Sequence, residues 1–439
     1  MTFELEIKDG RVLRPILSEE VEPNHLYKYD VTIPEGVVEI ADDAFYSVPE
    51  FRISKLKLPK TLRRIGIRAF KNTLDGTHNL TLPSGLEYIG DDAFQSEYEG
   101  DTPLVKAIKV PDSVKHLGAR AFFGFGKLES LHLGSSITHI GDGIVAQCYL
   151  LDSVTSASPE VNVDGNALIW KDTLLAVWGE MDSYTVPPDI KEIGDWAFSS
   201  CRTEKSFYGD KKYGPEQVDL PEGLRRIGDF AFYYLRLKQL HIPDSVEEIG
   251  LNPISFCPIK ELSGKFTYDG RAIIVGNHLR AHIWIAESAD IPDQVGILDE
   301  QAFINFSKPE SITIPSSVRV VGKECFFMSA IKELTFNEGL EKIDDEAFFW
   351  CHGLKEISFP SSLKELGSET FGFADNVRKI IFKGEIPPKF PDCIIRDENF
   401  KGIIRVPAES MDAYRQAFPE LTKPTPAQPN GRILKIKTN

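Results

Sequence analysis

The chain is short of positive charge. Its 439 residues contain 50 Lys and Arg against 66 Asp and Glu, which gives a formal net charge of −16. A surface that binds nucleic acid must neutralise phosphate groups with cations. The composition therefore argues against nucleic acid as a partner.

Long apolar runs, cysteine clusters and catalytic motifs are also missing. No stretch is apolar for long enough to span a bilayer. The six cysteines include no Cys-x-x-Cys pair and no Cys/His group at zinc spacing, so we predict no metal site. The sequence has no nucleophile elbow, Walker loop, dinucleotide-binding glycine pattern or His-Glu-x-x-His helix. We therefore predict a protein that is not an enzyme, has no catalytic residues and needs no cofactor.

The first ten residues do not resemble a secretory signal. They lack the basic end, the apolar core and the small-residue cleavage site of such a segment. We expect a chain that is either intracellular or already trimmed, and the sequence alone does not choose between the two.

What the sequence does contain is a short motif that fits twelve times. It runs apolar-x-apolar-Pro, then an apolar residue, then Ile-Gly and Ala-Phe, as in residues 56–70. The commonest spacing of 22 to 25 residues is that of leucine-rich repeats. The residues at the Ile position are Ile40, Ile65, Ile89, Leu117, Ile140, Ile193, Ile227, Ile249, Leu298, Val321, Ile343 and Leu366.

Each part of the motif has a physical reason. The apolar-x-apolar triplet is typical of a strand with one buried face, and proline ends the strand because it has no amide hydrogen to donate. Glycine after Ile suits a bend where a side chain would collide or where φ is positive. Because one turn cannot bury its own apolar side, we predict turns that stack on one another. The stack would contain a column of Phe45, Phe70, Phe94, Phe122, Phe198, Phe232, Phe303, Phe326, Phe348 and Phe371.

Acidic pairs recur directly after the Ile-Gly step or its equivalent. Examples are Asp42-Asp43 and Asp91-Asp92. Because their identity follows the repeat, we interpret them as solvated turns and helix-start acids rather than as an acid/base couple.

Two gaps in the repeat have similar sequences. The Ile positions at 140 and 193, and at 249 and 298, are separated by about one period plus 27 to 30 residues. Residues 163–169 resemble residues 268–274, and a polar turn follows each segment. Alternation around a short turn predicts β-hairpins that project near residues 161–183 and 266–288.

The two ends of the chain depart from the repeat. We predict an N-terminal cap at residues 1–30 and the repeat solenoid with its hairpin inserts at 31–384. Residues 385–422 should form degenerate turns and a capping helix, and 423–439 a linker and a short terminal strand. Such caps keep an open stack of strands from pairing with other chains.

The line Ile-Pro-x-x-Val-x-x-Ile-Gly-x-x-Ala-Phe-x-x-Cys resembles the BspA-like leucine-rich repeats of bacterial surface proteins. The resemblance covers roughly residues 31–407. It implies a mostly β, α/β-type repeat fold: a right-handed leucine-rich-repeat solenoid of about 12 repeats, with a parallel sheet on its concave side. For some members it also implies attachment to host matrix proteins or cells, and thus a cell-surface or secreted location. The chain departs from the family in having no secretion signal or lipoprotein cysteine near its start.

The middle residues of the repeat strands should form one outward stripe. It is polar and nearly neutral, which suits hydrogen bonding to a broad ligand, although Thr and Ser also simply fit an exposed sheet. The candidate binding residues in this stripe are Lys57, Thr81, Lys109, His132, Thr185, Asp219, His241, Thr313 and Thr335.

Three tryptophans, Trp170, Trp178 and Trp284, lie in the hairpin inserts. They could be exposed anchors of an interface, or they could pack the hairpins onto the solenoid. His278 and His282 would point the same way on a strand, so a metal-binding pair is conceivable. No third metal ligand lies nearby in the sequence.

These observations favour a non-catalytic binding or adhesion protein that presents an extended surface to a protein or glycan partner, with a host matrix protein as one candidate. The alternative is an intracellular scaffold that uses the same surface to hold a partner protein. The sequence does not indicate an oligomeric state.

Overall fold

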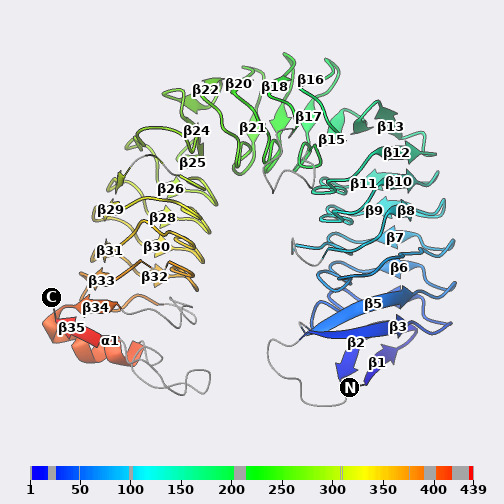
Figure 1. The fold of residues 1–439 in the computed structure, drawn as a ribbon, viewed down its shortest axis with the longest axis horizontal. Coiled ribbons are helices and arrows are strands. Elements are labelled where there is room, and N and C mark those ends of the chain that lie inside the picture. Colours follow the sequence, from blue (N-terminus) through cyan, green and yellow to red (C-terminus); the bar gives the residue numbers. More distant parts are fainter. Residues whose placement is uncertain are drawn as a thin grey trace. The chain divides into compact units, whose positions relative to one another are not determined.

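The structure is a computed structural model that describes residues 2–17, 26–48, 50–97, 102–201, 214–306, 308, 310–374, 376–389, 402–417 and 435–438. Strands stacked turn upon turn account for most of its regular structure (Figure 1). The chain divides into two compact units. Unit 1 consists of residues 1–236 and 245–248, and unit 2 of residues 237–244 and 249–439.

Each turn contributes two kinds of strand. A long strand, usually of three or four residues, alternates between outward and buried side chains, as β10 (Ser130–Leu133) does. A short strand of two residues ends at the Ile position of the motif, as β11 (His139–Ile140) does. Long strands pair in parallel with long strands, and short strands with short strands.

Unit 1 contains two ladders that include the short strands. The first is β1 (Phe3–Lys8), β2 (Arg11–Leu17), β4 (Glu39–Ile40), β6 (Arg64–Ile65), β7 (Tyr88–Ile89), β9 (His116–Leu117) and β11. The second is β13 (Val161–Asp164), β14 (Ala167–Trp170), β15 (Thr173–Val177), β17 (Glu192–Ile193), β19 (Arg226–Ile227) and β21 (Glu248–Ile249), a strand of which only Glu248 belongs to unit 1. The long strands form the groups β3 (Tyr27–Thr32) with β5 (Phe51–Lys57), β8 (Ala107–Lys109) with β10 and β12 (Ser153–Ser156), and β16 (Ser183–Thr185) with β18 (Gln217–Asp219).

Unit 2 repeats this arrangement. Its ladder is β23 (Thr267–Tyr268), β24 (Ala272–Val275), β25 (His278–His282), β26 (Ile297–Leu298), β28 (Val320–Val321), β30 (Lys342–Ile343) and β32 (Glu365–Leu366). Its long strands are β20 (Gln239–Ile242) with β22 (Glu261–Gly264), and then β27 (Ser311–Ile314), β29 (Glu333–Phe336), β31 (Glu356–Phe359), β33 (Lys379–Phe382), β34 (Ile403–Val406) and β35 (Lys435–Thr438).

The predicted fold class is confirmed: the described residues form a mostly β parallel solenoid of about 15 turns. The predicted number of about 12 is somewhat low. The strands β12 and β22 belong to turns without the full motif, and pairing with β10 and β20 places them in the stack. The turns at β33, β34 and β35 likewise depart from the motif.

The predicted core is confirmed in both units. All twelve residues at the Ile position are 2% exposed or less, and all ten residues of the phenylalanine column are 1% exposed or less. In unit 1 the ring centroids of Phe45, Phe70 and Phe94 follow one another at 4.8 and 5.4 Å. In unit 2 those of Phe303 and Phe326 lie 5.1 Å apart. Each turn therefore buries its apolar face against the next turn, as the sequence predicts.

The glycine after the Ile position is required because two turns approach closely there. A Cβ on Gly66 would overlap backbone atoms of Ala41 and Asp42 in the preceding turn, and one on Gly118 would overlap Gly90 and Asp91. Of the two reasons that the sequence left open for this glycine, collision is the correct one.

Positive φ angles occur instead two residues after this glycine and again two residues after the phenylalanine. Arg68 and Asn72 are one such pair, with φ values of 50° and 56°, and Glu346 and Trp350 are another, both at 57°. Between these positions, alternate amides donate to the next turn, as Asp43 N–H does to Ile67 O and Phe45 N–H to Ala69 O. The stacked turns thus satisfy the backbone without a helix.

The acidic pairs lie in turns and Asp42 is exposed, as predicted, but their interpretation as helix-start residues is wrong. No helix begins at these positions in the described residues. Instead, the carboxylate of Asp42 accepts the Ile67 amide of the next turn at 2.9 Å, and Asp91 accepts the Ala119 amide at 2.8 Å. The carboxylates therefore join one turn to the next, because each lies beside an amide that its own turn leaves unpaired.

The two hairpin inserts are present, but they do not simply project from the solenoid. In each, the last strand leaves the hairpin and joins the parallel ladder, β15 with β17 and β25 with β26. Across the first insert the neighbouring turns still touch, since the carboxylate of Asp142 accepts the Asp195 amide at 3.2 Å. The hairpin therefore forms one side of a complete turn.

The C-terminal end of the described chain holds one α-helix, α1 (Met411–Ala417), after a 3-10 turn at Ala408–Ser410. Tyr414 in this helix is fully buried, and its hydroxyl donates to Gly384 O at 2.9 Å. This contact holds α1 against the turn that contains β33. The predicted linker up to residue 434 lies outside the described residues.

We expect Phe94→Ala or Phe348→Ala to lower the free energy of unfolding by roughly 3–5 kcal/mol, because each removes a fully buried ring. Urea denaturation measures the loss. The matched control is Tyr46→Ala at a 41% exposed position, which should cost no more than about 1 kcal/mol. Near-neutral results at both phenylalanines would contradict the stacking described above.

Two glycines eight residues apart test the close approach of the turns. We expect Gly118→Ala to cost roughly 1–3 kcal/mol because its Cβ overlaps the preceding turn. Gly126 is the control, since its Cβ would meet atoms of Thr102 and Tyr149 only at 3.7 to 3.8 Å. Thermal unfolding should separate the two variants, and equal melting temperatures would rule out collision as the reason for glycine.

Candidate binding surface

The predicted stripe lies on the outward face of the long strands. Eight of its nine candidate residues are exposed, and His132 is partly buried. The structure gathers only some of them. Thr81, Lys109 and His132 line a hollow of about 690 Å³ in unit 1, and Thr313 lines a second hollow of about 540 Å³ in unit 2. The remaining candidates, Lys57, Thr185, Asp219, His241 and Thr335, line neither.

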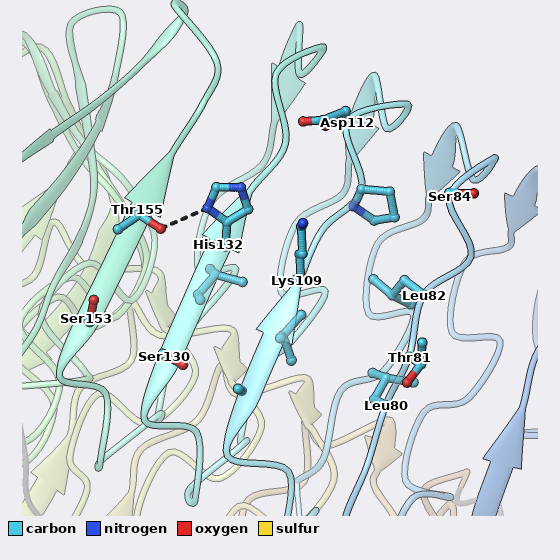
Figure 2. A pocket seen from close by; sticks show the side chains of 14 residues that line it. Leu80, Thr81, Leu82, Ser84, Lys109, Asp112, Ser130, His132, Ser153 and Thr155 are labelled. Carbon is cyan, nitrogen blue, oxygen red and sulfur yellow. Dashed lines mark hydrogen bonds between the residues drawn. The ribbon is translucent and has the colours of Figure 1, made fainter.

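The hollow in unit 1 lies over four successive turns. Figure 2 shows Thr81, Lys109, His132 and Thr155 on neighbouring segments of its floor. Alternation along each strand turns every second side chain outward, and the apolar neighbours such as Ile108 and Leu131 are buried. These apolar residues still line the hollow, so its floor combines outward polar side chains with apolar surface between them.

The hollow forms where the long-strand sheet stops. The sheet of β12, β10 and β8 ends at β8, and residues 80–82 of the preceding turn form no strand with it in the described part of the chain. The step from Ile89 to Leu117 is 28 residues long, slightly more than the commonest spacing of the repeat. The short strands β7 and β9 of the two turns remain paired.

Two polar contacts fix the orientation of side chains in the hollow. His132 Nδ1 lies 2.9 Å from Thr155 Oγ1 on the neighbouring strand, which leaves its Nε2 free of this bond. The carboxylate of Asp112 accepts the Ser135 amide at 3.0 Å, and the amide and hydroxyl of Ser135 lower the pKa of Asp112. Lys109 is exposed and forms no ion pair within the described residues. The floor thus offers a cation, a carboxylate and several hydroxyl groups.

Unit 2 repeats the histidine contact. His241 Nδ1 lies 3.0 Å from Ser263 Oγ, at a pair of facing residues on β20 and β22. In both units this pair links the last long strand before a hairpin to the strand that leads into it.

For the hairpin tryptophans, the structure favours packing onto the solenoid over an exposed anchoring role. Trp178 is 1% exposed, and its Nε1–H donates to Asp152 O at 3.3 Å. Trp178 therefore cannot be an exposed anchor in this conformation. Trp170 and Trp284 are partly buried, and the Lys171 ammonium lies 4.0 Å from the Trp170 ring centroid.

A row of stacked rings on the short strands was not found from the sequence. Tyr88 and His116 stack at 4.4 Å between ring centroids, and His116 and His139 at 4.3 Å. The Arg64 guanidinium caps one end, 4.0 Å from the Tyr88 centroid. Burial and the charge of His139 lower the pKa of His116. Each of these rings belongs to the residue directly before an Ile position. The motif leaves that position variable, so aromatic residues there in three successive turns were the available signal.

The structure offers little chemistry for catalysis in the described residues. No group of three or more His, Cys, Asp and Glu that could hold a metal ion occurs there. The five described cysteines are buried and free, and burial raises the pKa of thiols such as those of Cys148 and Cys201. Neutral buried thiols are poor nucleophiles. The described residues also contain no helix long and apolar enough to cross a membrane.

Comparison with known families agrees with the repeat geometry. The model of the BspA type leucine rich repeat region, which spans six copies, matches residues 25–151, 96–209, 203–268 and 281–393. The chain belongs to this family. BspA-type leucine-rich repeats are binding-type repeat proteins and are generally not enzymes. The match includes the whole floor of the hollow in unit 1.

Three solved structures are similar to this BspA-type chain. A leucine rich cell surface protein from Faecalibacterium prausnitzii is 19% identical, with 83% of this chain and 85% of that chain covered and a TM-score of 0.45. A leucine-rich repeat protein from Bacteroides ovatus is 20% identical, with 100% and 98% covered and a TM-score of 0.37. The pneumococcal vaccine antigen PcpA is 14% identical, with 100% and 96% covered and a TM-score of 0.46. A search of curated proteins gives no significant match.

His278 and His282 do not form a pair. His278 is partly exposed and its Nδ1 lies 2.9 Å from Asp299 Oδ1, whereas His282 is 6% exposed and its ring stacks on Phe303 at 5.3 Å. His282 bonds to Ile283 O at 3.1 Å. Burial lowers the pKa of His282 to about 4.

The buried imidazole of His282 should make stability depend on pH. Its folded pKa of about 4 lies below the ordinary value of 6.5, so between these values the unfolded chain binds more protons. Stability should therefore rise with pH across this window, by about 2–4 kcal/mol in total. His282→Phe should flatten the profile of unfolding free energy against pH, whereas His352→Phe, at an exposed position, should keep it. A His282→Phe profile identical to that of the parent would refute this assignment.

Proposed function

We propose that this protein is a non-catalytic recognition and adhesion protein that binds a protein or glycan partner along its long-strand sheet. The observation that carries the proposal is the hollow in unit 1. It brings three residues of the outward stripe, Thr81, Lys109 and His132, onto one floor. The family supports binding as the general role, and the hollow supplies a place for it.

The chemistry of the floor favours a polar partner. The hydroxyls of Thr81, Ser130 and Thr155 can donate and accept hydrogen bonds, and Lys109 adds a cation on the same floor. His132 is the one aromatic ring among the residues that line the hollow. A ligand that carries hydroxyl or carboxylate groups next to apolar surface fits such a floor, because its polar groups find partners while residues such as Leu80 and Leu82 contact the rest.

The polar contacts of the hollow do not assemble a catalytic triad. In a triad a hydroxyl, an imidazole and a carboxylate bond to one another in sequence. His132 bonds to the Thr155 hydroxyl, but the carboxylate of Asp112 accepts the Ser135 amide instead of a histidine N–H.

A double substitution tests the hollow. We expect Lys109→Ala with His132→Ala to weaken binding by about tenfold or more, because both central side chains of the floor are lost. The measurement is a screen of the full chain against a glycan array and purified matrix proteins, followed by titration of each hit.

The matched control is Lys57→Ala, an exposed stripe residue that does not line the hollow. It should leave affinity within about twofold, since an exposed rim charge contributes little. Hits that bind both variants with the affinity of the parent would remove the hollow from the proposal.

A further inference from the structure

A second surface lies in unit 2, at the corner of the turns after the buried phenylalanines. It consists of Phe327, Met328, Phe349, Trp350 and Phe373, which we call the aromatic shelf. Met328 is 40% exposed, Trp350 39% and Phe373 45%. These are among the most exposed large apolar side chains in the described residues, and they come from three successive turns.

Backbone hydrogen bonds hold the shelf in register. Met328 N–H donates to Phe349 O at 3.0 Å, and Trp350 N–H donates to Gly372 O at 2.9 Å. Met328, Trp350 and Phe373 all have positive φ, between 52° and 57°. The three exposed side chains therefore occupy the same position of successive turns and form a row.

The rings of the shelf contact one another. Phe327 and Phe349 stack with centroids 5.8 Å apart, and Phe349 meets Phe373 edge-on at 5.3 Å. A Cβ on Gly372 would overlap ring carbons of Phe349, so glycine leaves room for that ring. The shelf is thus a packed layer with one side exposed to solvent, which is the form of an interaction surface.

A column of carboxylates accompanies the shelf. Glu324, Glu346 and Glu369 lie four residues before the members of the exposed row, and all three have positive φ. Phe349 N–H donates to Glu346 O at 3.0 Å, so the acid and the ring share one tight turn. Burial and the charges of Glu324 and Glu369 raise the pKa of Glu346.

The same column in unit 1 has a different charge pattern. There Arg68 follows Asp43, and their side chains pair at 2.6 Å, while Arg120 follows Asp92 and pairs at 2.7 Å. Unit 1 therefore neutralises its own column from turn to turn. In unit 2 the column consists of three carboxylates, of which Glu324 pairs with Lys323 at 3.2 Å and accepts Gln301 Nε2–H at 2.7 Å. The charges of Glu324 and Glu369 both act on Glu346, so a cation from a partner would be attracted to this column.

We propose that the aromatic shelf and its carboxylate column bind a basic polypeptide segment of a partner protein. Apolar side chains of the segment would cover the exposed row, and its Lys or Arg side chains would meet the carboxylates. Charge complementarity favours this partner over a second copy of the chain, which carries a net charge of −16, and over an anionic lipid surface. The site uses a different face and a different unit from the proposed hollow, so neither depends on the other.

Binding of defined peptides to the full chain tests the proposal. The probe is a fluorescein-labelled peptide of ten alternating Lys and Leu residues, compared with versions that carry Glu for Lys or Ser for Leu. Fluorescence anisotropy should give a Kd for the Lys/Leu peptide that is about tenfold or more below the Kd of either comparison peptide. The reason is that the apolar contact and the charge contact both contribute to binding.

Two variants separate the parts of the surface. Trp350→Asn with Phe373→Asn removes the exposed rings, and asparagine tolerates positive φ. Glu346→Gln with Glu369→Gln removes charge and keeps shape. Each double variant should weaken binding of the Lys/Leu peptide by about tenfold. The control is Tyr46→Ser, a 41% exposed ring at the corresponding corner in unit 1, which should change Kd by less than about twofold.

The outcomes that overturn the proposal are distinct. Equal binding of the Lys/Leu and Lys/Ser peptides would mean attraction to charge alone, and unchanged affinity in both double variants would place the peptide elsewhere. A dimer of the parent in sedimentation that the Trp350→Asn, Phe373→Asn variant abolishes would assign the shelf to a second copy. If the circular dichroism spectrum shows that the Trp350→Asn, Phe373→Asn variant is unfolded, the peptide affinity of the Glu346→Gln, Glu369→Gln variant decides whether the proposal stands. Lys109→Ala with His132→Ala should leave peptide binding unchanged.

Discussion

The close approach of consecutive turns at the Ile-Gly corner is the constraint on which the rest of the structure depends. Glycine is needed there because a Cβ would enter the backbone of the preceding turn, as at Gly66 and Gly118. The approach lets the carboxylate of Asp42 reach the Ile67 amide, and it sets the spacing at which Phe70 and Phe94 stack. The core, the backbone pairing and the surface columns are all consequences of this one distance between turns.

Residues inside the motif were predictable because the repeat fixes which way each side chain points and whether it is buried. Ile89 and Phe94 are buried as predicted, and Lys109 points outward as predicted. The strand β12 was not found, since Ser153–Ser156 lacks the apolar-x-apolar-Pro pattern and becomes a strand by pairing with β10. The role of Asp42 was also missed, because its partner is an amide 25 residues further along the chain.

The binding surfaces illustrate the same limit. The stripe follows from alternation along each strand, but the hollow depends on where the long-strand sheet ends, at β8, which the motif does not specify. The residues of the aromatic shelf come one or two positions after the motif phenylalanine, where the motif does not specify a residue type. Trp350 is exposed and Trp178 is buried although the residue type is the same. Which of them is exposed depends on what the neighbouring turn places beside it.

The hairpins show that the solenoid is built from more than one kind of turn. The pair β1 and β2 has the same form as β14 with β15 and as β24 with β25. Each pair is antiparallel, contains a register shift shortly before its turn, and begins that turn with a residue of positive φ, which is Asp9, Lys171 or Gly276. Each then passes into a parallel ladder of short strands. A terminal cap and the two internal hairpins are therefore the same device, one that starts a ladder of short strands. The long strands pair in separate groups, and the ends of these groups, such as β8 and β12, are sheet edges. Those edges are where a solenoid of nearly identical turns can differ locally in shape and charge.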